Sequence, residues 1–182
     1  EILETIKADG GDLSDEIRDA RAVFKNLDSF KQILVAIGNH DDRFMRALGV
    51  GLKPIDLLVQ IERAQDKRWK IAPYYYTLLE TERGLYRIEH PRSAGKNAAI
   101  DLATQYHAHV IMGHSHRWSI NFDPSGDYWA IQQGHCVDET RLAYVMQRSA
   151  KRDAHKLGAT IVRGGYPFVL NEDVPWDILK RM

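Results

Sequence analysis

Three short segments of the sequence carry side chains that can bind a metal ion. The first is Gly38-Asn39-His40-Asp41, the second is His90 with Pro91, and the third is Gly113-His114-Ser115-His116. Imidazole nitrogens with amide or carboxylate oxygens suit Zn, Mn or Fe, whereas the single cysteine, Cys136, cannot supply a thiolate site. The segments therefore favour a metal centre of the kind used in two-metal hydrolysis.

Each segment follows a run that the periodicity predicts to be a strand. Gln32–Ile37 is a continuous aliphatic and β-branched run, typical of a strand buried on both faces, and the polar residues after it are predicted to form a tight turn. Leu85–Glu89 forms a predicted hairpin with Thr77–Thr81, and His109–Met112 is a short apolar strand. Loops beyond the carboxyl ends of strands meet on one rim in open α/β folds, so we expect the three segments to approach one another.

The rest of the chain alternates predicted helices and strands. Residues 14–27 and 95–107 have apolar side chains at helical spacing, and Pro54 is a candidate start for a helix through Ile61. Further strands are predicted at Trp69–Ala72, 118–122, 128–132, Ala159–Arg163 and Tyr166–Leu170. No linker or repeat interrupts this pattern, which predicts a single α/β domain over residues 1–182.

The composition excludes several classes of protein. The chain has 182 residues, 44% of them hydrophobic, and its 25 basic and 25 acidic residues give a formal net charge of +0. The protein therefore has no net electrostatic field that would attract a membrane or nucleic acid. Nucleic acid is still possible as a substrate. The single cysteine and the lack of an apolar run of membrane-spanning length predict a cytoplasmic protein.

In order and spacing, the three segments resemble signature blocks of the calcineurin-like metallophosphoesterases. Gly38-Asn39-His40-Asp41 is similar to the third block, His90 to the fourth, and Gly113-His114-Ser115-His116 to the fifth. The stretches from Asp15 to Arg43, HPRSAGK and YHAHVIMGHSHRWS are most similar to a branch common among phage and bacterial proteins. The resemblance extends from about residue 14 to residue 170.

This resemblance implies a β-sandwich flanked by helices, with metal ions at the loops of one edge. It implies hydrolysis of phosphomonoesters or phosphodiesters by a metal-bridging hydroxide, with two Mn, Fe or Zn ions as cofactors. His40 would be the general acid that protonates the leaving alkoxide, and Asp41 would orient its ring. The implied ligands are, for the second metal ion, Asn39, His90 and His114, and for the first, His116.

The chemistry of the first segment agrees with these roles. Asn39 offers a neutral amide oxygen to a divalent ion, while His40 stays off the metal and keeps a proton to give. The adjacent Asp41 carboxylate would stabilise the imidazolium. Arg43 or Arg117 could contact phosphate oxygens, although a solvated or structural role is more common for such arginines.

The chain departs from the family pattern at its start. The first block, an Asp-x-His after an N-terminal strand, is missing, so we expect the chain to be the C-terminal portion of a longer protein, and its activity by itself stays open. Gly11-Asp12-Leu13-Ser14-Asp15 matches the second block literally, yet the polar residues before it favour a helix-entry loop over a metal-bridging role for Asp12.

Two further expectations follow from the missing strand. The open sheet edge predicts a homodimer or a strand-swapped assembly. The alternative to an enzyme is a noncatalytic binding module that keeps the fold and some metal ligands and acts by docking to a partner. Among the other histidines, His107 and His109 are predicted to be surface and strand-entry residues. For His135 and Cys136, packing is the more common role, with a place at the edge of the site as the alternative.

Overall fold

A computed structural model of the chain describes residues 13–48, 56, 65–72, 74–91, 95–136 and 155–171. The chain divides into two compact units, Glu1–Tyr75 and Tyr76–Met182, here called unit 1 and unit 2. Both units combine helices with strands, which confirms the predicted α/β class. The single domain over residues 1–182 stays a prediction. Within the described ranges, no helix is long and apolar enough to cross a membrane.

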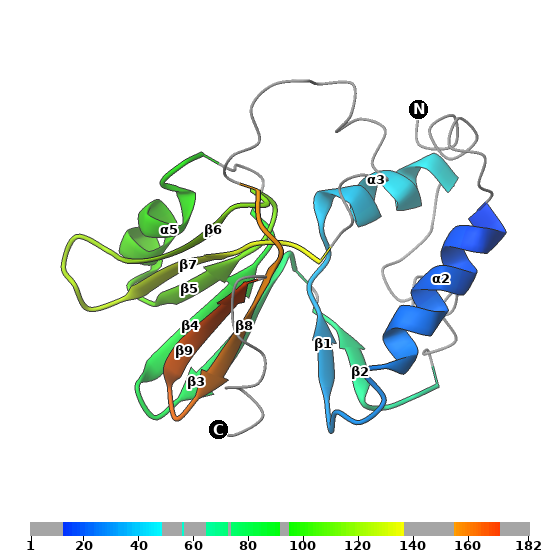
Figure 1. Cartoon of the computed structure of the whole chain (residues 1–182), viewed down its shortest axis with the longest axis horizontal. Helices are drawn as coiled ribbons and strands as arrows, with labels where there is room; N and C mark the ends of the chain where they lie inside the picture. Colours follow the sequence, from blue (N-terminus) through cyan, green and yellow to red (C-terminus); the bar gives the residue numbers. More distant parts are fainter. Residues whose placement is uncertain are drawn as a thin grey trace. The chain divides into compact units, whose positions relative to one another are not determined.

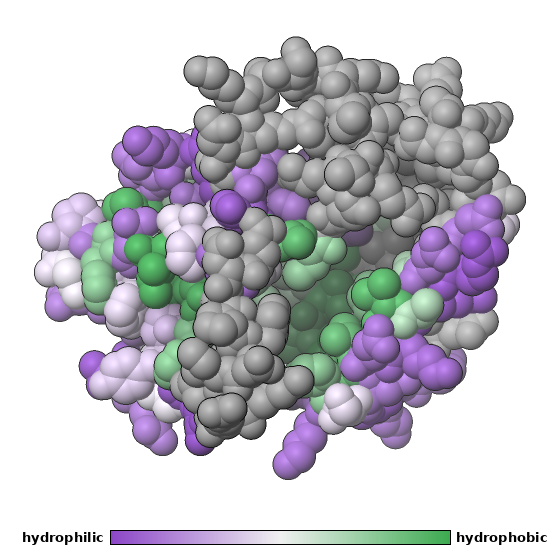
Figure 2. Space-filling model, in the orientation of Figure 1, coloured by the Kyte–Doolittle hydropathy of each residue, from purple (hydrophilic) through white to green (hydrophobic). Residues whose placement is uncertain are grey.

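Unit 1 packs a helix against a small parallel sheet (Figure 1). Its described elements are α2 (Leu13–Lys25), β1 (Ile33–Val35), α3 (Asn39–Leu48) and β2 (Trp69–Ile71). The Phe24 ring of α2 meets the Trp69 ring of β2 edge-on, with 5.3 Å between the ring centroids. The surface over α2 is hydrophilic in Figure 2, as expected for a helix that buries only one stripe of apolar residues.

The strand predicted at Gln32–Ile37 is confirmed over a shorter range, but the prediction that it is buried on both faces is wrong. β1 covers only Ile33–Val35, and the Leu34 side chain is 44% exposed. The described sheet of unit 1 has two strands, β1 and β2. Successive side chains of a strand point to opposite faces, so Leu34 lies on the face of β1 that is the more open to solvent.

The predicted tight turn after Ile37 is also wrong, because the chain enters α3 at Asn39. The Gly38 backbone N–H donates to Asp41 Oδ2 at 2.8 Å, and the Asp42 N–H donates to the Gly38 carbonyl at 3.1 Å. A carboxylate three residues into a helix that accepts from the N-cap N–H is one half of a capping box. The sequence Gly38-Asn39-His40-Asp41 therefore starts a helix and places Asn39 and His40 in its first turn.

Unit 2 is built on a mixed five-stranded sheet in the order β3-β4-β5-β7-β6. β4, β5 and β7 run parallel, and β3 and β6 join the two edges antiparallel. These strands confirm the predicted ones, with bounds of Tyr76–Thr81 for β3, Gly84–Glu89 for β4, His109–Met112 for β5, Trp118–Phe122 for β6 and Trp129–Gln133 for β7.

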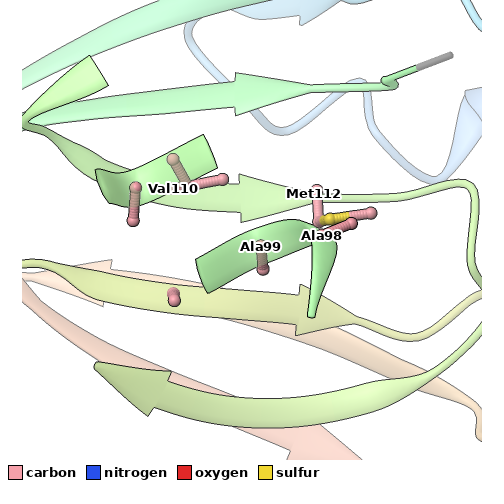
Figure 3. Close-up of a cluster of buried hydrophobic side chains, with 6 residues drawn as sticks. Ala98, Ala99, Val110 and Met112 are labelled. Carbon is pink, nitrogen blue, oxygen red and sulfur yellow. The ribbon is translucent and has the colours of Figure 1, made fainter. Parts of the chain in front are cut away.

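Opposite faces of this sheet bury separate clusters. Val110 and Met112 of β5 point toward α5 (Ala98–Tyr106), where the small residues Ala98 and Ala99 let the helix approach closely (Figure 3). Ile111, between them, faces the other way and packs with Tyr86 and Ile131. Side chains of the hairpin β8 (Gly158–Arg163) and β9 (Tyr166–Asn171) cover that second cluster. β5 is therefore buried on both faces.

The β8–β9 hairpin is fixed to the sheet at its turn. The Tyr86 hydroxyl donates to the Gly165 carbonyl at 2.7 Å, and burial raises the pKa of Tyr86 to about 12. Gly165 has a φ of +76°, and a Cβ atom there would lie 2.7 Å from the Arg83 side chain, so the turn requires glycine. This contact holds the hairpin over the Tyr86 face of the sheet.

The remaining element predictions have mixed outcomes. The helices predicted at 14–27 and 95–107 are confirmed as α2 and α5, although α5 begins only at Ala98 and ends where His107 takes a left-handed φ of 47°. The strands predicted at Trp69–Ala72 and around Gly164-Gly165 are confirmed as β2, β8 and β9. The helix predicted from Pro54 lies outside the described residues except at position 56, and Asp12 lies outside them as well.

Candidate metal centre

Three parallel strands of unit 2 end at the same edge of its sheet, and a histidine follows each of them. Glu89 at the end of β4 is in register with Met112 of β5, which in turn is in register with Gln132 of β7. Trp118, the first residue of β6, pairs with Gln133 and begins at this edge. We call this the histidine edge, and its residues are His90, His114, His116, His135 and His155.

His90 and His114 meet directly at this edge. Nδ1 of His114 lies 2.9 Å from Nε2 of His90, and the two rings stand nearly perpendicular with centroids 4.8 Å apart. The Gly113 backbone N–H donates to the Glu89 carbonyl at 3.1 Å, which joins the two strand ends just before these side chains. The contact confirms that two of the three predicted loops approach one another.

The loop that carries His114 and His116 has an unusual backbone. Both residues have a left-handed φ, 75° for His114 and 56° for His116, which side chains other than glycine adopt rarely and at a cost. Ser115, between them, donates its hydroxyl to Gln132 Oε1 at 2.6 Å, and the buried Gln132 donates Nε2–H to the Lys96 carbonyl at 3.0 Å. This relay anchors the loop to β7 and to the segment before α5.

A second group of rings surrounds His116. Its ring centroid lies 5.0 Å from that of His135 and 5.3 Å from that of His155, and the latter two are 6.3 Å apart. A β-bridge joins His155 to Arg117, and another joins His135 to Leu157. His135 therefore lies beside the candidate ligand His116, which agrees with the alternative role considered for it.

No pattern in the sequence points to His155. It lies outside any predicted strand and any histidine motif, and a β-bridge to Arg117 brings it near His116. Only a prediction of the pairing between these two segments would have found it.

The remaining candidate ligand and the candidate acid belong to unit 1. Asn39 is half-buried at the start of α3, and one oxygen of Asp41 accepts the Gly38 N–H. The side chain of His40 lies outside the described part of the chain. That Asn39 shares an ion with His90 and His114, and that Asp41 orients His40, both stay predictions.

His109 is not a surface residue, contrary to the prediction. It is buried, its Nδ1 accepts the Trp129 backbone N–H at 3.0 Å, and its Nε2 lies 3.0 Å from the Arg83 carbonyl. Since one nitrogen accepts a hydrogen bond and the other faces an acceptor, the ring is the neutral tautomer with its proton on Nε2. His109 thus joins β7 to the β3–β4 turn, whereas His107 is exposed as predicted.

Among the described residues, no group of three or more His, Cys, Asp or Glu side chains is already arranged to hold a metal ion. Comparisons of the chain with protein-family models, with curated proteins and with solved structures found no match.

Proposed function

We propose that the protein is a metal-dependent phosphoesterase that hydrolyses phosphomonoesters or phosphodiesters. The observation that carries the proposal is the contact between His90 and His114, whose nearest ring nitrogens are 2.9 Å apart. The resemblance assigns these residues, 24 positions apart, to the same metal ion. Their meeting at one sheet edge supports that assignment.

The separation of these nitrogens suits ligands of one ion. Imidazole nitrogens bind Zn²⁺ at about 2.0–2.1 Å, so two of them at right angles on an ion lie about 3 Å apart. Neutral imidazoles together with an amide oxygen from Asn39 form a donor set for Zn, Mn or Fe. Bound divalent ions would supply an activated water and would offset negative charge on the phosphoryl oxygens.

The first turn of α3 carries the candidate acid and a candidate ligand. α3 begins at Asn39, and the carboxylates of Asp41 and Asp42 in this turn offset the partial positive charge of the helix start and favour a cation beside it. In the proposal, His40 in this turn donates a proton to the leaving alkoxide, and Asn39 binds the ion shared with His90 and His114. Both roles would require the start of α3 to lie near the histidine edge during catalysis.

The finer fold assignment belongs to the same proposal. A β-sandwich flanked by helices is supported in unit 2, where α5 packs on one face of the sheet and the β8–β9 hairpin covers the other. We propose a cytoplasmic location, for which the single cysteine, Cys136, is the support. A homodimer or strand-swapped assembly is also proposed, from the sequence alone.

The test measures metal content and hydrolysis of bis-p-nitrophenyl phosphate and p-nitrophenyl phosphate, with Mn²⁺ and Zn²⁺ supplied. The His114→Ala and His90→Ala variants should lose one bound ion and turnover, because each removes a nitrogen ligand. His40→Ala should keep its metal and lose turnover, because an acid and not a ligand is removed. His107→Asn is the matched control, since it removes an exposed histidine and keeps a residue that tolerates the left-handed backbone.

Two results would contradict the proposal. Full turnover in His90→Ala and His114→Ala would show that these side chains do not serve the reaction. Metal binding without hydrolysis of either ester would favour the noncatalytic binding module instead.

A further inference from the structure

We propose that His116, His135 and His155 bind one divalent transition-metal ion, with Zn²⁺ as the best-suited example. Nothing in the sequence resemblance assigns a role to His135 or His155. The inference rests on the proposed function in one respect, because His116 is the residue that the resemblance assigns to the first metal ion. It adds the ligands that would complete that ion's site within unit 2.

The spacing of the three rings carries the inference. With Zn–N distances of about 2.0–2.1 Å, three imidazoles around a tetrahedral ion have ring centroids about 5 Å apart. The His116 ring meets this value with both neighbours, at 5.0 Å from His135 and 5.3 Å from His155. The rings of His135 and His155 are farther apart, at 6.3 Å, so they would have to turn toward each other to share one ion with His116.

Backbone hydrogen bonds hold together the segments that carry these three rings. The Lys156 N–H donates to the His116 carbonyl at 3.0 Å, and the His135 N–H donates to the Lys156 carbonyl at 3.1 Å. The Gly158 N–H closes the set by donating to the His135 carbonyl at 2.9 Å. These hydrogen bonds hold the segments that carry His116, His135 and His155 in one small ladder.

Ion binding would require only side-chain rotation. The three rings are not arranged as ligands in this structure, since they meet edge-on or tilted, with interplanar angles of 61°, 74° and 40°. The χ2 torsion of histidine is broad, so turning a ring on its Cβ costs little. The cluster thus has fixed Cα positions and adjustable rings.

The donor chemistry defines the class of ion. Three neutral imidazoles suit Zn²⁺, Ni²⁺ or Cu²⁺, whereas Mg²⁺ and Ca²⁺ take oxygen ligands. Three protein ligands on a tetrahedral ion leave one position open for water or for a substrate oxygen. The histidine edge would then carry two metal sites, one at His90 and His114 and one at these three histidines.

The experiment is Zn²⁺ binding to the whole chain by equilibrium dialysis, which needs no activity. His135→Gln and His155→Gln should each lose one bound ion or weaken its binding by more than about tenfold, since even outer-shell partners of ligands are worth that much. His107→Asn, the control, should bind as the unmodified chain does. Circular dichroism of each variant verifies that the fold is retained.

Unchanged Zn²⁺ binding in both glutamine variants would overturn the inference. X-ray absorption of the His114→Ala variant with one equivalent of Zn²⁺ gives a second test that does not alter the cluster: three imidazoles support the site, and fewer overturn it. The two proposals fail separately. Loss of an ion only in His135→Gln and His155→Gln would keep this site and reject the His90–His114 one, and loss only in His90→Ala and His114→Ala would do the reverse.

Discussion

β1 and β5 both lead into segments that carry candidate metal ligands, but their surroundings differ. β5 lies between two parallel neighbours, β4 and β7, with α5 on one face and the β8–β9 hairpin on the other. β1 pairs with β2 in the described part of unit 1, and Leu34 at its centre is 44% exposed. Similar apolar runs therefore gave one fully buried strand and one half-exposed strand.

The difference affects how each set of side chains is positioned. Parallel strands that end in register bring their following loops together, which is why His90 and His114 meet after β4 and β5. After β1, by contrast, the positions of Asn39 and His40 are set by a helix start and its cap. The histidine edge depends on strand neighbours, and the Asn39 segment depends on local helix geometry.

The largest difference in stability is expected when a central side chain of each strand is shortened to alanine. Met112→Ala should lower the free energy of unfolding of unit 2 by about 2–5 kcal/mol, because it removes a fully buried side chain and leaves a cavity. Leu34→Ala should cost about 1 kcal/mol or less, because the side chain is already partly in water. Amide hydrogen exchange measures both, since it reports on each unit separately. Equal costs for the two variants would contradict the difference in burial.

The next effect concerns the relay that anchors the His114–His116 loop. Gln132→Leu should lower the free energy of unfolding by about 1–3 kcal/mol. It removes the amide that bonds the Ser115 hydroxyl and the Lys96 carbonyl in a part-buried site. Gln133→Leu is the matched control, since strand alternation points Gln133 to the other face. Urea unfolding measures the cost. If both variants lost the same stability, the relay would not be what holds the loop.

A smaller effect is expected at the start of α3. Asp41→Ala should cost about 0.5–1 kcal/mol, because it removes the acceptor for the Gly38 N–H. Asp42→Ala removes an ion pair with the exposed Arg46, at 2.9 Å, and should lower the free energy of unfolding by about 0.3–0.5 kcal/mol. Thermal unfolding of the two variants measures which one loses more stability. A larger loss in Asp42→Ala would show that the cap does not position this segment.

The smallest effect on stability is expected at the opposite end of β6 and β7 from the histidine edge. Asp123 lies there, in the turn between the two strands. Burial acts to raise the pKa of Asp123, but hydrogen bonds from Ser125, Tyr128 and Asp127 outweigh it and leave that pKa below its ordinary value of 3.8. Because the folded pKa is the lower one, this stabilisation is present above pH 3.8 and is lost as the pH falls toward the folded pKa.

Asp123→Asn should therefore weaken the acid dependence of unfolding below pH 3.8 and change little of the dependence above it. Urea unfolding at a series of acidic pH values measures this, with Asp127→Asn, an exposed neighbour, as the control. An unchanged slope in Asp123→Asn would mean that this carboxylate is not a source of acid sensitivity.

Local pattern in the sequence was sufficient for most elements of the fold. The hairpin of β3 and β4, the strand His109–Met112 and the turn at Gly164-Gly165 follow from alternation, apolar runs and turn residues, which act over a few positions. The same local rules identified His90, His114 and His116 as residues that follow strands. They did not detect the capped helix at Asn39, because one Asp side chain at the third helical position decided it.

The tertiary structure alone decided which side chains meet. The exposure of Leu34 and the burial of His109 depend on what packs against each side chain, and the approach of His155 to His116 depends on a bridge between segments distant in sequence. Such pairings are set by the packing of whole sheet faces and by the register of non-local strands. The sequence by itself therefore determined which residues can carry chemistry, and packing determined which of them act together.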